Sequence, residues 1–152
     1  MMTQAKNLLE RSEKNYKNAK ILLKEGKYSQ SLDQLHDAIE NILKSILSYY
    51  DVKYPPRHNV SRFIPEVIHK IPENEASSYI YREVTLPSLF IIHNILCSIR
   101  NYVRYGYKDI PSEKMFNKDI TNLLHDLVDI YFPLIKGFVI EFSFKKKLKY
   151  KV

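Results

Sequence analysis

The chain has few of the residues on which functional assignment from sequence usually rests: one cysteine, three glycines and no tryptophan among 152 residues. A single cysteine, Cys97, excludes an intramolecular disulfide framework and is typical of a reducing compartment. The charged N-terminal segment lacks the apolar core of a secretion signal, and no apolar run approaches the ~20 residues of a membrane helix. We therefore expect a cytoplasmic protein with no membrane partner.

The formal charge of +7 is concentrated at the C-terminus. The segment KKKLKYKV, residues 145–152, contains five lysines, and without it the charge is about +2. Such an end either aids solubility or forms a polybasic arm for RNA, DNA or an acidic partner, and we favour solubility. Because the length fits one domain, we assign residues 1–144 to a single domain and residues 145–152 to a Lys-rich tail.

Apolar residues recur at intervals of three and four along most of the chain, which predicts helices. Gly26 and Gly106 are expected to end two of them. Pro87 either kinks the third long helix or opens its second half at the first helical position. We predict an all-α, up-down bundle of four to five helices, at about residues 3–25, 29–50, 61–68, 74–105 and 117–142.

The last predicted helix contains Pro133, where we expect a bend. Its final part, FVIEFSF at residues 138–144, resembles a strand but would have no strand to pair with. The residues expected to face the core are Ile120, Leu123, Leu124, Leu127, Tyr131, Leu134, Phe138 and Phe142.

Most motifs that carry chemistry are missing, including a Gly-rich phosphate loop, a zinc-binding cysteine pair and a nucleophile elbow. The five histidines are scattered, without an expected metal partner at helical spacing, and we predict surface or boundary positions for them. The histidines of the two His-Asp pairs, at residues 36–37 and 125–126, are expected to diverge from their aspartates. The sequence therefore predicts no metal site and no cofactor. One polar stripe stands out on the third long helix: His93, Cys97, Arg100, Arg104 and Tyr107.

Three stretches resemble the HEPN domain family (higher eukaryotes and prokaryotes nucleotide-binding), whose members are small helical bundles. The first is AKILLKEGKYSQSLDQLHDAIENILKSIL, with a Gly-x-Tyr turn followed by Ala38, Glu40 and Lys44. The second is RHNV, residues 57–60, which matches a His-x-apolar signal. The third is CSIRNYVRYGYKD, residues 97–109. Together they span nearly the whole chain, and the resemblance implies a helical bundle.

The third stretch is similar to the family's signature of an arginine, a polar residue and a histidine at a spacing of four to six residues. Arg100 and Asn101 match, whereas Tyr105 or Tyr107 stands where the histidine belongs. In toxin-type relatives the pattern extends to a tyrosine that a partner nucleotidyltransferase modifies with adenylate, and Tyr107 falls on it. The resemblance implies catalytic positions at Arg100, Asn101 and Tyr105.

Active relatives are metal-independent endoribonucleases, usually dimers with a cleft between subunits. Arginine would neutralise the scissile phosphate, and histidine would exchange the proton of the 2′-hydroxyl or the leaving oxygen. A tyrosine, with a pKa near 10, is a poor substitute at neutral pH. We therefore expect Arg104, Tyr107 and His93 to contribute to binding, and cleavage to be weak or absent.

The leading hypothesis is a homodimer that binds RNA or a nucleotide phosphate in an interfacial cleft, with a nucleotidyltransferase as a candidate partner. The first alternative is an active endoribonuclease toxin of a toxin–antitoxin pair that uses Tyr105 or His93 in place of the missing histidine. The second alternative is a structural helical adaptor whose polar stripe is only a dimer seam and which has no affinity for nucleic acid.

Overall fold

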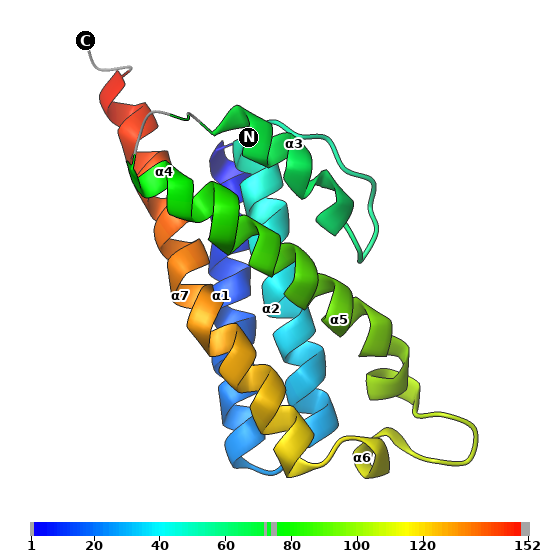
Figure 1. Cartoon of the computed structure of the whole chain (residues 1–152). Coiled ribbons are helices and arrows are strands. Elements are labelled where there is room, and N and C mark those ends of the chain that lie inside the picture. Colours follow the sequence, from blue (N-terminus) through cyan, green and yellow to red (C-terminus); the bar gives the residue numbers. More distant parts are fainter. Residues whose placement is uncertain (1, 72, 74–75, 150–152) are drawn as a thin grey trace.

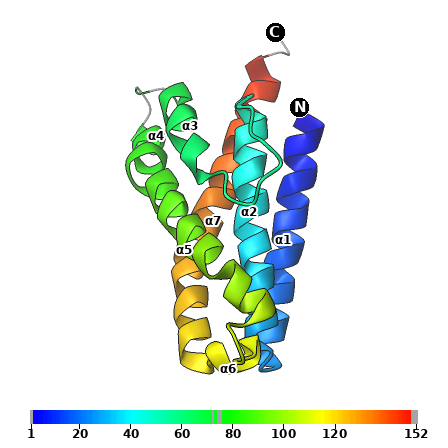
Figure 2. The ribbon, with the colours of Figure 1, turned by 90° about the vertical axis from the view of Figure 1, so that its right-hand side faces the viewer.

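The computed structural model describes residues 2–71, 73 and 76–149, with side chains described for 3–71, 73 and 78–140. Long helices that alternate in direction dominate the fold, and they pack side by side around one apolar core (Figures 1 and 2). The described residues contain no strand, only an isolated bridge between Tyr107 and Ile110. The predicted all-α bundle is confirmed. The long helices are α1 (Met2–Lys24), α2 (Tyr28–Tyr49), α5 (Leu86–Tyr105) and α7 (Lys118–Lys149).

The first two helices form a tight antiparallel hairpin through a turn at Gly26, which has a positive φ of 73°. Large apolar side chains on one side of α2 are buried: Leu32, Leu35, Ile39, Ile42, Leu43, Ile46 and Leu47. The contact with α1 is close because small residues line it. Buried serine hydroxyls donate across it to main-chain carbonyls: Ser12 to Ala38, Ser31 to Ala19 and Ser45 to Ala5, at 2.6–2.7 Å.

A loop after α2 leads into a short 3-10 turn (Ser61–Phe63) and α3 (Ile64–Lys70), which agrees with the short helix predicted there. The side-chain oxygen of Asn59 starts this turn by accepting hydrogen bonds from the main-chain N–H and the hydroxyl of Ser61. Val60 and Ile64 are buried, so the loop is held against the bundle. His58 is consequently fixed beside α2 and α5.

The third long helical region is built from three parts. Helix α4 (Ala76–Ile80) passes into a single π-helical turn (Tyr81–Thr85), and α5 follows with Pro87 in its first turn. Proline suits this position because the first N–H groups of a helix have no internal partner. Pro87 thus opens the second half of the region, one of the two outcomes expected for it. Helix α5 ends at Gly106, as predicted, and lies obliquely across α2 (Figure 1).

A wide turn containing the short helix α6 (Ser112–Met115) connects α5 to α7. The expected core-facing side of α7 is partly wrong. Phe138 is buried, but Ile120, Leu123 and Leu134 are exposed, while Thr121, His125, Val128 and Ile135 are buried in their place. Phe142 has a side chain outside the described residues. Helix α7 is apolar on more than one side, so spacing alone did not identify the side that packs.

Helix α7 continues through Pro133 and beyond the predicted end at residue 142, so the FVIEFSF segment is helical. Residues 145–149 of the Lys-rich tail are helical in their backbone, and residues 150–152 lie outside the described part. Nothing after Gly137 provides a glycine or proline to stop the helix. Among the described residues, no helix is both long enough and apolar enough to cross a membrane.

Candidate functional site

A polar cleft of about 680 Å³ lies where α1, α2 and α5 meet the loop after α2. Basic groups outnumber acidic ones along its walls, because Arg11, Lys14, Lys44, Arg100 and Arg104 face two carboxylates. The residues that line it are Leu8, Arg11, Lys14, Asn15, Asn18, Asp37, Glu40, Asn41, Lys44, His58, Arg100 and Arg104. The residues of this chain give the cleft a net positive charge suited to an anion.

Arg100 is a partly buried cation of this cleft that no carboxylate of the described residues neutralises. Its Nε is buried and has no hydrogen-bond partner, and the described residues provide no ion pair for its guanidinium. The charge of Arg100 also affects Asp37. Burial acts to raise the pKa of the Asp37 carboxyl, but the hydrogen bond and charge of His36, together with Arg104 and Arg100, lower this pKa overall. An arginine with unused donors at the wall of a basic cleft is well suited to hold a phosphate oxygen.

Arg104 lies one turn further along α5 and is bound to α2. Its Nε donates to Asp33, and its Nη2 lies 3.7 Å from Asp37. The hydrogen bond that it donates to Asp33 raises the pKa of the guanidinium above its ordinary value. Arg104 therefore anchors α5 to α2 and contributes less free charge to the cleft than Arg100.

The other predicted motif residues do not line the cleft. Successive residues of a helix are turned by about 100°, so Asn101 and Tyr105 leave α5 away from Arg100, and Tyr105 is 79% exposed. Tyr107 lies past the helix end with its ring 5.7 Å from that of Tyr102. Gly106 has a φ of 71°, and a Cβ there would meet the Ile110 carbonyl at 2.2 Å. Both tyrosines are exposed to solvent.

His93, which the sequence placed in the binding stripe, is fully buried behind the cleft. Its Nε2 donates to the main-chain carbonyl of His58 at 2.9 Å. Burial, aided by the charge of His36, lowers the pKa of His93 to about 4. The ring is therefore neutral at pH 7 and has no path to a substrate in the cleft.

The expectation of surface or boundary histidines is wrong for three of the five, because His36, His93 and His125 are at most 2% exposed. The predicted divergence of His36 and Asp37 is wrong as well, since Nδ1 lies 3.2 Å from the carboxylate. The side chains diverge on an ideal helix, but a short aspartate can still reach back to a ring fixed by burial.

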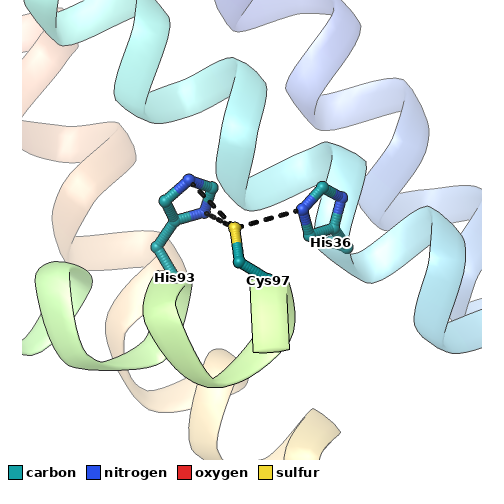
Figure 3. A group of neighbouring side chains, drawn as sticks. All are labelled: His36, His93 and Cys97. Atoms are coloured by element: carbon teal, nitrogen blue, oxygen red, sulfur yellow. Dashed lines mark hydrogen bonds between the residues drawn. The ribbon is translucent and has the colours of Figure 1, made fainter. Parts of the chain in front are cut away.

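His36, His93 and Cys97 meet between α2 and α5 (Figure 3). The Sγ of Cys97 lies 3.5 Å from Nε2 of His36 and 3.6 Å from Nε2 of His93. Burial, and then the charge of Glu40, raise the pKa of the thiol to about 11, which Arg100 partly offsets. Sequence reasoning missed this cluster. The His93-x3-Cys97 spacing was a signal for half of it, because residues four apart share a helix side.

The sequence indicated His58 only as part of the RHNV stretch, without a role in the site. Its imidazole nevertheless lines the cleft, and its side chain is 58% exposed. Its Nδ1 lies 3.1 Å from Glu40, whose other oxygen is bound by Lys44. The cleft therefore contains a histidine, although not at the motif position. Glu40 and Lys44, the matched residues of α2, hold it in place.

Residues 5–127 match the HEPN domain family. The match covers α1 to the first turns of α7 and includes all three stretches that carried the resemblance. The chain therefore belongs to the HEPN domain family, as the sequence predicted. No protein of curated function and no solved structure matches it.

Proposed function

We propose that the protein binds RNA or a nucleotide phosphate in the cleft between α1, α2 and α5. The observation that carries this proposal is Arg100, whose guanidinium lines a basic cleft without an ion-pair partner among the described residues. A phosphate would use donors that are already desolvated in part, and it would be attracted by Arg11, Lys14 and Lys44 on the opposite walls. Membership of the HEPN family supports an RNA-related ligand.

Fluorescence anisotropy with a labelled oligoribonucleotide at low salt tests this proposal. Arg100→Ala should weaken binding at least tenfold, because a hydrogen bond to a charged group contributes about 1.5–3 kcal/mol. Arg62→Ala is the matched control, since it removes the same charge from an exposed residue that does not line the cleft. Equal losses in the two variants would mean that only net charge matters and would overturn the assignment of the cleft.

We also propose that the protein is a homodimer. An exposed apolar row follows the π-turn and α5 at Val84, Ile91, Ile95 and Tyr102. It lies roughly opposite Arg100 and Arg104 around the helix. Several exposed apolar side chains on one side of a helix are a common feature of interfaces. A dimer formed there would leave both clefts open, unlike the interfacial cleft expected from the resemblance.

Light scattering coupled to gel filtration tests the dimer. Ile91→Asp and Ile95→Asp should each shift the mass to that of a monomer, because a charge buried in an apolar interface is costly. Ile21→Asp, an exposed isoleucine on α1, should leave the dimer intact. A monomeric wild-type protein at high micromolar concentration would exclude this proposal.

A second candidate function is metal-independent RNA cleavage, and the position of His58 favours it. An exposed imidazole beside Glu40, in the same cleft as Arg100, has the groups needed for proton transfer at a bound phosphate. His58 would then replace the missing motif histidine, since His93 is buried and Tyr105 lies outside the cleft.

Incubation of total RNA with the protein in EDTA tests for cleavage. Activity should disappear in both Arg100→Ala and His58→Asn and persist in His69→Asn, an exposed histidine on α3. Cleavage that survives the two cleft variants would come from a contaminant, and absence of cleavage in the wild type would leave binding as the function.

A nucleotidyltransferase partner in the cytoplasm is the last part of the proposal. Tyr107 is 47% exposed and lies in the turn after α5, so its hydroxyl is accessible to a partner enzyme. Adenylate transfer from ATP to this oxygen, with release of pyrophosphate, should add one adenylate group to the intact mass. Tyr107→Phe should abolish the addition and Tyr105→Phe should not; modification of Tyr105 instead would correct the assignment.

A further inference from the structure

A second site is built into the seam between α2 and α5, behind the wall of the cleft. His36 comes from α2, while His93 and Cys97 come from successive turns of α5, and their side chains converge on one point (Figure 3). One ligand atom from each lies within 4.8 Å of the others. We propose that these three side chains bind a zinc ion.

The distances fit this ion. In tetrahedral zinc sites, Zn–S is about 2.3 Å and Zn–N about 2.0–2.1 Å, so a sulfur and a nitrogen on the same ion lie about 3.6 Å apart. The Sγ of Cys97 lies 3.5 Å from Nε2 of His36, and it lies 3.6 Å from Nε2 and 4.0 Å from Nδ1 of His93. Zinc binding through Nδ1 would therefore require the His93 ring to turn so that Nδ1 becomes the nitrogen nearer the sulfur.

Both imidazoles are oriented by their second nitrogen. Nδ1 of His36 lies 3.2 Å from Asp37 and 3.8 Å from Glu40, which leaves Nε2 to face the sulfur. Nε2 of His93 donates to the His58 carbonyl, which leaves the lone pair on Nδ1. Partners of this kind, a carboxylate or a main-chain carbonyl on the far nitrogen, fix the rings of zinc-binding histidines.

The surroundings suit a soft divalent cation. His36 and His93 are buried and Cys97 is half-buried. The ion would therefore be shielded from water by the histidines and reached by water only from the side of Cys97. On binding, the thiol loses its proton to solvent, and the thiolate offsets part of the charge of the ion. Two imidazoles and a thiolate select zinc over magnesium or calcium, which prefer oxygen ligands. A water molecule would fill the fourth position.

Titration of the untagged full-length protein with Co²⁺, after treatment with EDTA and its removal, tests the site. One equivalent should produce the visible bands of a tetrahedral cobalt site together with a near-ultraviolet thiolate-to-cobalt band, and Zn²⁺ should displace both. Cobalt binding without the thiolate band would overturn the proposal, and so would an absence of binding.

Variants test the individual ligands by zinc calorimetry. Asp37→Asn removes an outer partner of a ligand and should weaken zinc binding by about 10–100-fold. Cys97→Ser is nearly isosteric but removes a ligand, so it should weaken zinc binding more than Asp37→Asn does. His125→Gln, a buried histidine outside the cluster, should bind zinc like the wild type. Wild-type affinity in a folded Cys97→Ser variant would overturn the proposal.

Alkylation of the wild-type protein gives a measurement that needs no variant. Cys97 is the single cysteine of the chain, so iodoacetamide reports on it alone. Zinc should slow this reaction, because a ligated thiolate is shielded from the reagent. An unchanged rate at saturating zinc would overturn the proposal independently of RNA binding.

Discussion

At the scale of single residues, His125 shows how a buried titratable group makes stability depend on pH. The ring lies in the core between α7 and α2, with Nε2 2.6 Å from the Ser31 hydroxyl. Its Nδ1 is buried and has no hydrogen-bond partner among the described residues. Burial, reinforced by the charge of Lys20, lowers the pKa of His125 to about 4. The folded protein therefore holds this imidazole neutral.

The direction of the effect follows from proton binding. Because the pKa of an unfolded histidine is about 6.5, the unfolded chain binds the proton more tightly than the folded one. The contribution of His125 to folding is complete above pH ~6.5 and is lost as the pH falls toward 4. We expect His125→Gln, which keeps a donor for Ser31, to remove up to about 3 kcal/mol of this pH dependence.

Urea unfolding at several pH values between 4 and 7 measures the difference between wild type and His125→Gln. His69→Gln is the control, because His69 is exposed on α3 and should leave the pH profile unchanged. Parallel profiles for wild type and His125→Gln would contradict the expectation.

At the scale of elements, the α1–α2 hairpin depends on serines that sequence patterns assign to a polar side. Ser12, Ser31 and Ser45 are fully buried, and each donates to a carbonyl of the opposite helix. Small side chains allow the two backbones to approach closely. Each buried hydroxyl has a hydrogen-bond acceptor, because a carbonyl of the opposite helix lies within reach. The hairpin is thus held by close packing as well as by the apolar row of α2.

We expect Ser45→Ala to lower the free energy of unfolding by about 1 kcal/mol, the usual contribution of one hydrogen bond. Ser45→Leu should cost more, about 1–3 kcal/mol, because the contact has no room for a larger side chain. Ser88→Ala removes a local, solvent-exposed hydrogen bond at a half-buried position and should have little effect. Denaturant unfolding of the three variants gives the ranking, and equal values for Ala and Leu at position 45 would contradict it.

The ends of several helices could be predicted from the sequence, whereas the side of α7 that packs into the core could not. Gly26, Pro87 and Gly106 determine helix ends through backbone geometry alone, so the sequence located those ends correctly. Helix α7 carries apolar residues on two sides, and the choice between Leu123 and His125 for the core depends on what α1 and α2 place opposite.

Part of the candidate site could be predicted from helical spacing, and the rest depends on how distant segments pack. The arginine stripe of α5 could be identified from spacing, and Arg100 and Arg104 do line one cleft. Asn101 and Tyr105 share a sequence motif with them but not a helix side. His36 lies about sixty residues from Cys97 in the chain, and His58 about forty. Only the packing of α2 and the following loop against α5 brings them to the site.

At the scale of the whole molecule, charge is divided between the C-terminal tail and the cleft. Removal of residues 145–152 lowers the formal charge from +7 to about +2. We expect this truncation to weaken RNA binding at low salt while the ratio of wild-type to Arg100→Ala affinity persists, because the tail attracts RNA without positioning it. Anisotropy at several salt concentrations measures both, and loss of the ratio on truncation would place the binding in the tail instead.

His58 belongs to both candidate sites, with its carbonyl bound by His93 and its imidazole beside Glu40 in the cleft. Two ligands that bind through one shared residue are thermodynamically linked. If zinc raises the affinity for RNA by some factor, RNA must raise the affinity for zinc by the same factor. A divalent charge next to an anion site favours such positive linkage, so zinc bound at the proposed site would strengthen the proposed binding of an anion in the cleft.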